Sequence, residues 1–136
     1  MLADSAQAVG GKLYILGGGW SVIGPEPAPT AIVAKIEVPW NETNRPHTIR
    51  FELVDDHGNA FIAEGQEEPL VLSAEFEVGR PAGLKPGTPI DLPVAINLAP
   101  LPLEPDQRYE WRLWIDEDTQ EEWRVGFTVR SADARH

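Results

Sequence analysis

The C-terminal part of the chain alternates between apolar and polar residues. In the segment 108–116 the apolar side chains fall on one side of the alternation: Tyr109, Trp111, Leu113 and Ile115. The same alternation recurs in the segment 122–130, after a polar turn. Because successive side chains of a strand point to opposite faces, this pattern is typical of half-buried β-strands. We therefore predict a two-stranded hairpin at this end of the chain.

Four earlier segments show the same alternation and predict four more strands. They cover the ranges 32–40, 48–54, 70–78 and 90–98. The last of these contains Pro93, which has no main-chain N–H to donate to a sheet. We therefore expect the strand at 90–98 to be bulged or to lie at a sheet edge.

Two shorter strands are predicted near the N-terminus, over residues 3–9 and 12–16, with Gly10-Gly11 between them. The second of these is apolar on both faces, which favours a central position in a sheet. Gly17-Gly18-Gly19 then interrupts the pattern before it resumes at Trp20. Successive glycines indicate a bulge, or a place where another backbone or a ligand approaches closely.

The spacing of these segments predicts the fold class. Thirteen prolines and twelve glycines leave almost no window for an amphipathic helix. We expect an all-β chain with seven to nine strands, folded as a single two-sheet antiparallel β-sandwich of the immunoglobulin-like kind. Tyr109 also lies where immunoglobulin-like sandwiches commonly carry a tyrosine. The expected domain covers residues 1–130, and residues 131–136 are expected to form a flexible C-terminal tail.

Composition narrows the classes of function. The 136 residues suit one domain, and the absence of cysteine excludes disulfides and a cysteine nucleophile and fits a reducing cytosol. With neither a signal peptide nor a long apolar run, we expect a cytoplasmic protein that does not bind membranes. A net charge of −11 repels the phosphate backbone, so nucleic-acid binding is not expected.

No combination of residues typical of catalysis emerges from the sequence. The segment 10–13 lacks the hydroxyl residue and the helix of a phosphate-binding loop. The acidic segment 116–122 lacks the glycine that a calcium-binding loop requires, and His47 and His57 are isolated in the sequence. We therefore expect a protein that is not an enzyme and that has no cofactor and no metal site.

The most informative candidate for function is Trp114, because the alternation forces it onto the outer face of its strand together with Arg112. We predict that Trp114 lies opposite Arg124 in the C-terminal hairpin and stacks on it, because the alternative register would place Arg112 opposite Arg124. Tryptophan and arginine are enriched in interfaces between proteins. Trp114, Arg112 and Arg124 are therefore predicted to contact a second copy of the chain or a protein partner. The alternatives to an interface role are stacking at the surface alone, or coverage of Trp114 by another part of the same chain.

A second hypothesis assigns the chain to small-ligand or carbohydrate binding. Trp20 and Trp40 lie beside predicted strand ends, where a sandwich presents its loops. Together with the bend at Gly18, they would form an aromatic platform for a sugar ring. Packing at the edge of the core is the commoner role for such tryptophans.

Three parts of the sequence resemble a family of short, uncharacterised bacterial proteins. They are the segment from Ala3 to Leu13, the segment from Gly79 to Pro89, and Tyr109-Glu110-Trp111. The resemblance covers most of the chain. It implies a cytoplasmic bacterial domain of similar size, and it implies no activity and no site residues.

Overall fold

The structure is a computed structural model that describes residues 1–132. Within residues 1–132 the named elements are nine strands and a single-turn 3-10 helix, η1 (Trp40–Glu42). The strands are β1 (Leu2–Val9), β2 (Lys12–Gly18), β3 (Val22–Ile23), β4 (Thr30–Val38), β5 (His47–Asp55), β6 (Val71–Phe76), β7 (Ile90–Leu98), β8 (Gln107–Ile115) and β9 (Arg124–Val129). The predicted flexible tail falls largely on residues 133–136, which lie outside the described residues.

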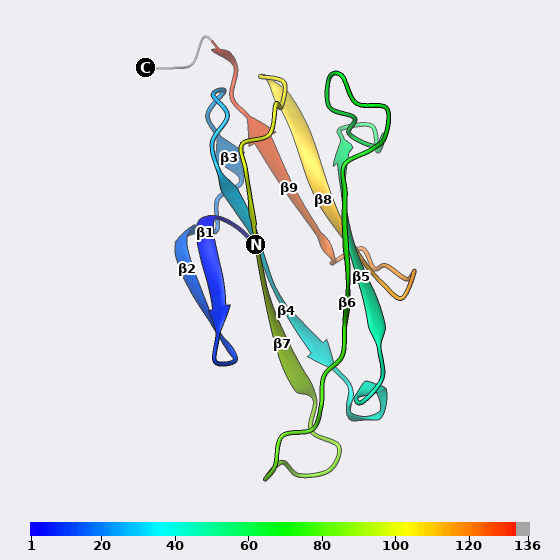
Figure 1. Cartoon of the computed structure of the whole chain (residues 1–136). Coiled ribbons are helices and arrows are strands. Elements are labelled where there is room, and N and C mark those ends of the chain that lie inside the picture. Colours follow the sequence, from blue (N-terminus) through cyan, green and yellow to red (C-terminus); the bar gives the residue numbers. More distant parts are fainter. Residues whose placement is uncertain (133–136) are drawn as a thin grey trace.

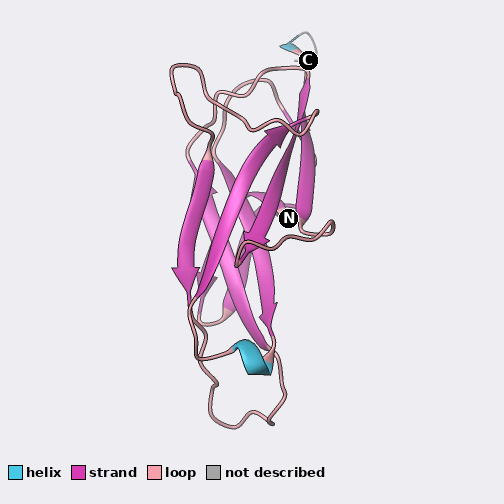
Figure 2. Ribbon diagram, turned by 90° about the vertical axis from the view of Figure 1, so that its right-hand side faces the viewer, coloured by secondary structure: helices cyan, strands magenta, loops and turns pink. Residues whose placement is uncertain are grey.

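The strands form two sheets that pack face to face, so the predicted β-sandwich is confirmed (Figures 1 and 2). One sheet has the strand order β2-β1-β4-β7 and the other β3-β9-β8-β5-β6. All strand pairs are antiparallel except β3 and β9, which run parallel. The expectation of a purely antiparallel fold is corrected at this one pair. Pro93 lies in β7, which is an edge strand as predicted.

The core lies between the two sheets and is built from the predicted inward-facing positions. In β5 and in the first half of β8 the alternate residues are buried, with Leu53 fully inaccessible and Trp111 only 3% exposed. The largest contributions from the opposite sheet come from β4. The other buried members of this core are Leu2, Ile32, Ile36, Val38, Ile49, Phe51, Val78, Ile90, Tyr109, Phe127 and Val129.

Tyr109 makes the contact that its position in the sequence suggested. Its ring is buried and stacks on Phe127, with 5.8 Å between the ring centroids. Its hydroxyl oxygen accepts a hydrogen bond of 3.0 Å from the main-chain N–H of Glu104, five residues upstream. This tie between a late strand and the preceding connection is a recurrent feature of immunoglobulin-like sandwiches.

The β1–β2 hairpin departs from the prediction. The strand at 12–16 was expected to be central, but β2 is the outermost strand of its sheet. Gly10 and Gly11 both have positive φ, 59° and 76°, as a tight two-residue hairpin turn requires. β1 pairs with β4 only through Leu2 and Ala3, and the hairpin then diverges from β4 (Figure 1). A second, smaller cluster of buried residues anchors the hairpin: Ala3, Ala6, Ala31 and Val33.

The glycines at the end of β2 precede the passage of the chain from one sheet to the other. Gly17 has a φ of 60°, a backbone conformation that residues other than glycine rarely adopt. A Cβ atom at Gly18 would lie 2.7 Å from Ile15 Cγ2 and 3.0 Å from Met1 Sδ, so the close approach at this point is made by side chains of the same chain. Beyond the glycines only Val22 and Ile23 form a strand, and they pair with β9 in the second sheet.

Candidate functional site

The outer face of the five-stranded sheet holds Trp114, but with a different neighbour from the one predicted. Trp114 lies opposite Arg50 of β5, and the Arg50 guanidinium carbon is 4.9 Å from the centre of the indole ring. Arg124 instead lies opposite Arg112. The predicted register of the C-terminal hairpin was therefore wrong, and the cation stacked on Trp114 comes from another strand.

Two features of the chain explain this register. Asp116 and Glu117 turn the chain tightly with positive φ angles of 51° and 65°, and the residues up to Trp123 then form an irregular turn before β9 begins. The repulsion between Arg112 and Arg124 is offset by Glu110. One Glu110 carboxylate oxygen accepts a hydrogen bond of 2.8 Å from Arg112 Nε and lies 4.0 Å from Arg124 Nε.

The three arginines nearest Trp114 are therefore already paired within the chain. Arg50 bonds to Glu52 over 3.0 Å and to Glu117 over 2.5 Å. Arg112 and Arg124 share Glu110. The interface role of Trp114, Arg112 and Arg124 stays a prediction, and their arrangement is accounted for by contacts inside the sheet.

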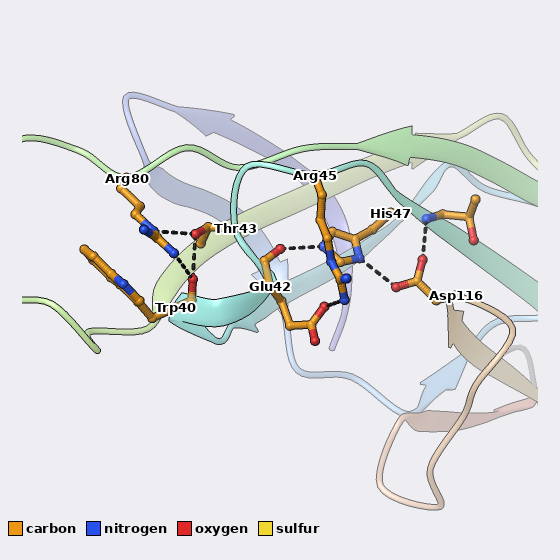
Figure 3. Close-up of polar contacts among 8 residues, drawn as sticks. Trp40, Glu42, Thr43, Arg45, His47, Arg80 and Asp116 are labelled. Atoms are coloured by element: carbon orange, nitrogen blue, oxygen red, sulfur yellow. Dashed lines mark hydrogen bonds and ion pairs between the residues drawn. The ribbon is translucent and has the colours of Figure 1, made fainter.

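The structure does not bring Trp20 and Trp40 together. The Trp20 ring packs edge-on against Phe127 at 6.0 Å and lines a cavity of only about 20 Å³, room for one water molecule. Trp40 lies in η1 beneath Arg80, whose guanidinium carbon is 4.2 Å from the ring centre (Figure 3). Arg80 also donates to the Trp40 carbonyl oxygen and to the Thr43 hydroxyl. An aromatic platform for a sugar has no support in this geometry.

A polar cluster that the sequence did not reveal lies at the start of β5 (Figure 3). His47 is 6% exposed and stacks on Phe76 at 5.3 Å. Its Nδ1 atom lies 2.6 Å from Asp116 Oδ2, and its Nε2 atom lies 2.7 Å from the carbonyl oxygen of Glu42. The second oxygen of Asp116 accepts a hydrogen bond of 2.9 Å from the Thr48 N–H. The cluster thus fixes η1 and the left-handed turn after β8 to the same strand.

This cluster predicts a dependence of stability on pH. The hydrogen bond with His47, followed by that from Thr48, holds the pKa of Asp116 below its ordinary value of 3.8. A lowered carboxyl pKa stabilises the folded chain above the ordinary value and loses this contribution as the pH falls through the folded-state pKa. Because the Asp116 side chain is 49% exposed, we expect at most about 1 kcal/mol. In urea unfolding, the deficit of Asp116→Asn relative to the parent chain should be present at pH 7 and shrink below about pH 4. A deficit that stays constant down to pH 2.5 or so would contradict this.

The edge strands of the two sheets differ in how well they are protected against pairing with another chain. β7 contains Pro93, β3 has only two residues, and β6 carries Glu75. Prolines, short strands and charges are the usual means by which sheet edges avoid association. β2 has seven residues and, after Lys12, contains neither a proline nor a charge. Among the four described edge strands, β2 is therefore the least protected.

β2 also exposes apolar side chains. Four of the nine exposed large hydrophobic residues in the described chain lie in the β1–β2 hairpin: Val9 (55%), Tyr14 (57%), Ile15 (40%) and Leu16 (70%). The hairpin is nearly uncharged, since residues 2–18 hold only Asp4 and Lys12. In a chain with a net charge of −11, this is a place where an acidic partner meets little repulsion.

The hydrogen bonding of the hairpin determines which main-chain groups of β2 face outward. A two-residue turn makes Val9 and Lys12 a hydrogen-bonded pair, and such pairs alternate along an antiparallel ladder. Leu13 and Ile15 therefore direct their N–H and C=O groups away from β1. On the other side of the hairpin, the Asn97 side chain bonds to both main-chain groups of Ala6, at 3.1 and 2.8 Å. The outward main-chain groups of Ala6 on the β1 side of the hairpin are thus bonded by a side chain, whereas those on the β2 side are open.

Comparison with known proteins places the chain in a family. A family model described as a family of unknown function, DUF6941, matches residues 1–130. The chain belongs to DUF6941. No match was found among curated proteins or among solved structures. The predicted membership of a family without known function is thereby confirmed. Among residues 1–132 of this DUF6941 chain there is no helix with the length and apolar character needed to cross a membrane.

Two features of this DUF6941 domain differ from the sequence-based expectations, and the alternation of side chains along β5 accounts for the first of them. His47 has the same parity as Ile49, Phe51 and Leu53 and therefore belongs to the inner face, where a histidine needs polar partners. The apolar faces of the strand at 12–16 favour a central position. The same pattern fits an edge strand that lies against one surface and is open on the other.

Proposed function

We propose that this domain is a non-catalytic, cytoplasmic module of protein–protein contact that associates with a second copy of itself through the open edge of β2. The observation that carries the proposal is the exposed apolar strand with unpaired main-chain groups, which is the least protected of the four edge strands. Addition of a strand to a sheet edge is a recurrent mode of recognition between proteins.

A second copy fits β2 because the strand is self-complementary when paired antiparallel. The regular stretch from Lys12 to Leu16 is centred on Tyr14. Pairing about Tyr14 lets Leu13 exchange main-chain hydrogen bonds with the partner subunit's Ile15, and the reverse. The two Tyr14 side chains then lie side by side as an aromatic cross-strand pair. Such an isologous contact forms a closed dimer and leaves neither copy of β2 open.

The ends of this stretch supply a charge test. In the same pairing, Leu16 lies opposite the partner subunit's Lys12. The aliphatic part of a lysine packs well on a leucine while its ammonium group stays in water. A second cation at position 16 would instead meet a like charge directly across the ladder, which destabilises strand pairing.

The test is the solution molar mass by light scattering over a concentration series. We expect the parent chain to approach twice its monomer mass of 15.0 kDa as concentration rises. Leu16→Lys should remain a monomer over the same range. Leu16→Glu is the matched control, because it loses the same apolar surface but places an anion opposite Lys12, and it should dimerise more strongly than Leu16→Lys.

Two outcomes would overturn the proposal. A parent chain that stays monomeric at every concentration would leave β2 without a second copy. Equal loss of the dimer in Leu16→Lys and Leu16→Glu would show association through apolar surface without the proposed register. Circular dichroism of each variant establishes that the fold is retained.

A further inference from the structure

The sandwich has a second open edge, beside β4. The Met1 amino group donates to the Val33 carbonyl oxygen over 2.7 Å, and the Val33 N–H donates to the Met1 carbonyl oxygen over 2.9 Å. β1 pairs with β4 no further, although β4 continues to Val38. Because hydrogen-bonding direction alternates along a strand, Lys35 and Glu37 direct their main-chain groups to the same side as Val33. None of the described strands pairs with β4 there.

A groove of about 860 Å³ follows this edge, between β4 and the β8–β9 hairpin. The inner face of the five-stranded sheet forms its apolar floor. The side chains that remain only half-buried there are Leu113, Ile115, Trp123 and Val125. Their partial exposure has a simple cause, since at this level the four-stranded sheet contributes only β4 and β7 to cover them. The groove therefore lies where a further strand beside β4 would cover the inner face of the five-stranded sheet.

The rim of the groove is acidic. The arginine and lysine side chains that line it are already engaged: Lys35 with Asp91 at 3.9 Å, Arg45 with Glu42, and Arg124 with Glu110 at 4.0 Å. The Met1 amino group at one end of the groove donates to the Val33 carbonyl oxygen. Glu37, Asp118 and Glu122 form no ion pair within the described residues. A segment lying in the groove thus meets an excess of negative charge at its polar positions.

We infer that this groove binds an extended, basic segment of a partner protein, with apolar residues at every second position and lysine or arginine between them. The segment would run antiparallel to β4 and take up the main-chain groups of Lys35 and Glu37. Its apolar side chains would pack on Leu113 and Val125. Its cations would lie beside Glu37 and beside the turn between β8 and β9 that carries Asp118 and Glu122. This site is separate from the β2 edge, and each can be tested without the other.

The experiment measures binding of a fluorescent synthetic peptide of alternating lysine and valine by anisotropy. We expect saturable binding by the parent chain. An alternating peptide of glutamate and valine should bind at least about tenfold more weakly at low salt. A peptide with the same lysines and valines in two blocks, which cannot present one apolar face as a strand, should also lose about tenfold.

Two substitutions of Lys35 distinguish the contribution of main-chain hydrogen bonding from that of the side-chain charge. Lys35 lies opposite Pro93, and its N–H faces the open edge, so Lys35→Pro removes the donor without breaking the ladder with β7. We expect Lys35→Pro to weaken binding of the lysine–valine peptide by about tenfold, and Lys35→Ala to change it by less than about threefold. Leu16→Lys should bind this peptide as the parent chain does.

The inference is overturned if the lysine–valine peptide shows no saturable binding. Equal binding of the glutamate–valine or block peptide would also overturn it, as would unchanged binding by a folded Lys35→Pro variant. A loss of molar mass in Lys35→Pro would assign the groove to a second copy instead of a basic partner. The peptide-binding results do not bear on the β2 edge, whose test is the response to Leu16→Lys.

Discussion

Replacing Trp111 with alanine is expected to lower the free energy of unfolding by about 3–5 kcal/mol, the cost of emptying a fully packed aromatic site. The side chain is 3% exposed and lies in the core between the two sheets. Its loss removes apolar contacts with both sheets and leaves a cavity that the surrounding strands cannot fill.

Trp114 provides the matched control, because it lies on the same strand, three residues further on, and faces the other way. It is half-buried on the outer face and stacks on Arg50. Trp114→Ala should therefore cost only about 1–2 kcal/mol. Urea unfolding followed by circular dichroism gives both values. Equal costs for the two variants would contradict the assignment of inner and outer faces in β8.

The alternation of side chains was sufficient to predict the strands of the core. The predicted strands at 48–54, 90–98 and 108–116 correspond closely to β5, β7 and β8. Pro93 correctly marked an edge, and Tyr109 correctly marked a corner tied back to Glu104. These features depend on local chemistry, namely the pleat of a strand, the missing donor of proline and the reach of a tyrosine hydroxyl.

The pairing of the strands could not be predicted in the same way. A shift of two residues keeps every apolar side chain on the same face, so the alternation cannot distinguish the predicted partner of Arg124, Trp114, from the observed one, Arg112. Repulsion between Arg112 and Arg124 alone favours the wrong register, because Glu110 compensates both arginines in the observed one.

The candidate sites depend on contacts between distant parts of the sequence. His47 and Asp116 are 69 residues apart, and Asn97 satisfies Ala6 from 91 residues away. The open edge of β2 follows from its position as the outermost strand of its sheet, while Asn97 and the small cluster around Ala6 hold β1 on the other side of the hairpin. Sequence patterns show that a strand is apolar, but only the topology shows which of its edges is unpaired.

The proposed dimer makes a sharp geometric prediction for β2. If two copies pair antiparallel about Tyr14, the two Tyr14 Cα atoms are about 4.5 Å apart, within the range of about 4.4–6.8 Å that a disulfide spans. The two Leu16 residues are then offset by about 13 Å along the strands, beyond the reach of a disulfide. Cross-linking should therefore fall steeply on either side of position 14.

The chain contains no cysteine, so single cysteines report on this geometry without interference. The decisive measurement is the yield of disulfide-linked dimer, on non-reducing gels after mild oxidation, for cysteine placed singly at Leu13, Tyr14, Ile15 and Leu16, with Val71→Cys on β6 as the control. The account predicts a maximum for Tyr14→Cys and little dimer for Leu16→Cys and the control. A flat profile along β2, at the level of Val71→Cys, would contradict pairing through this edge.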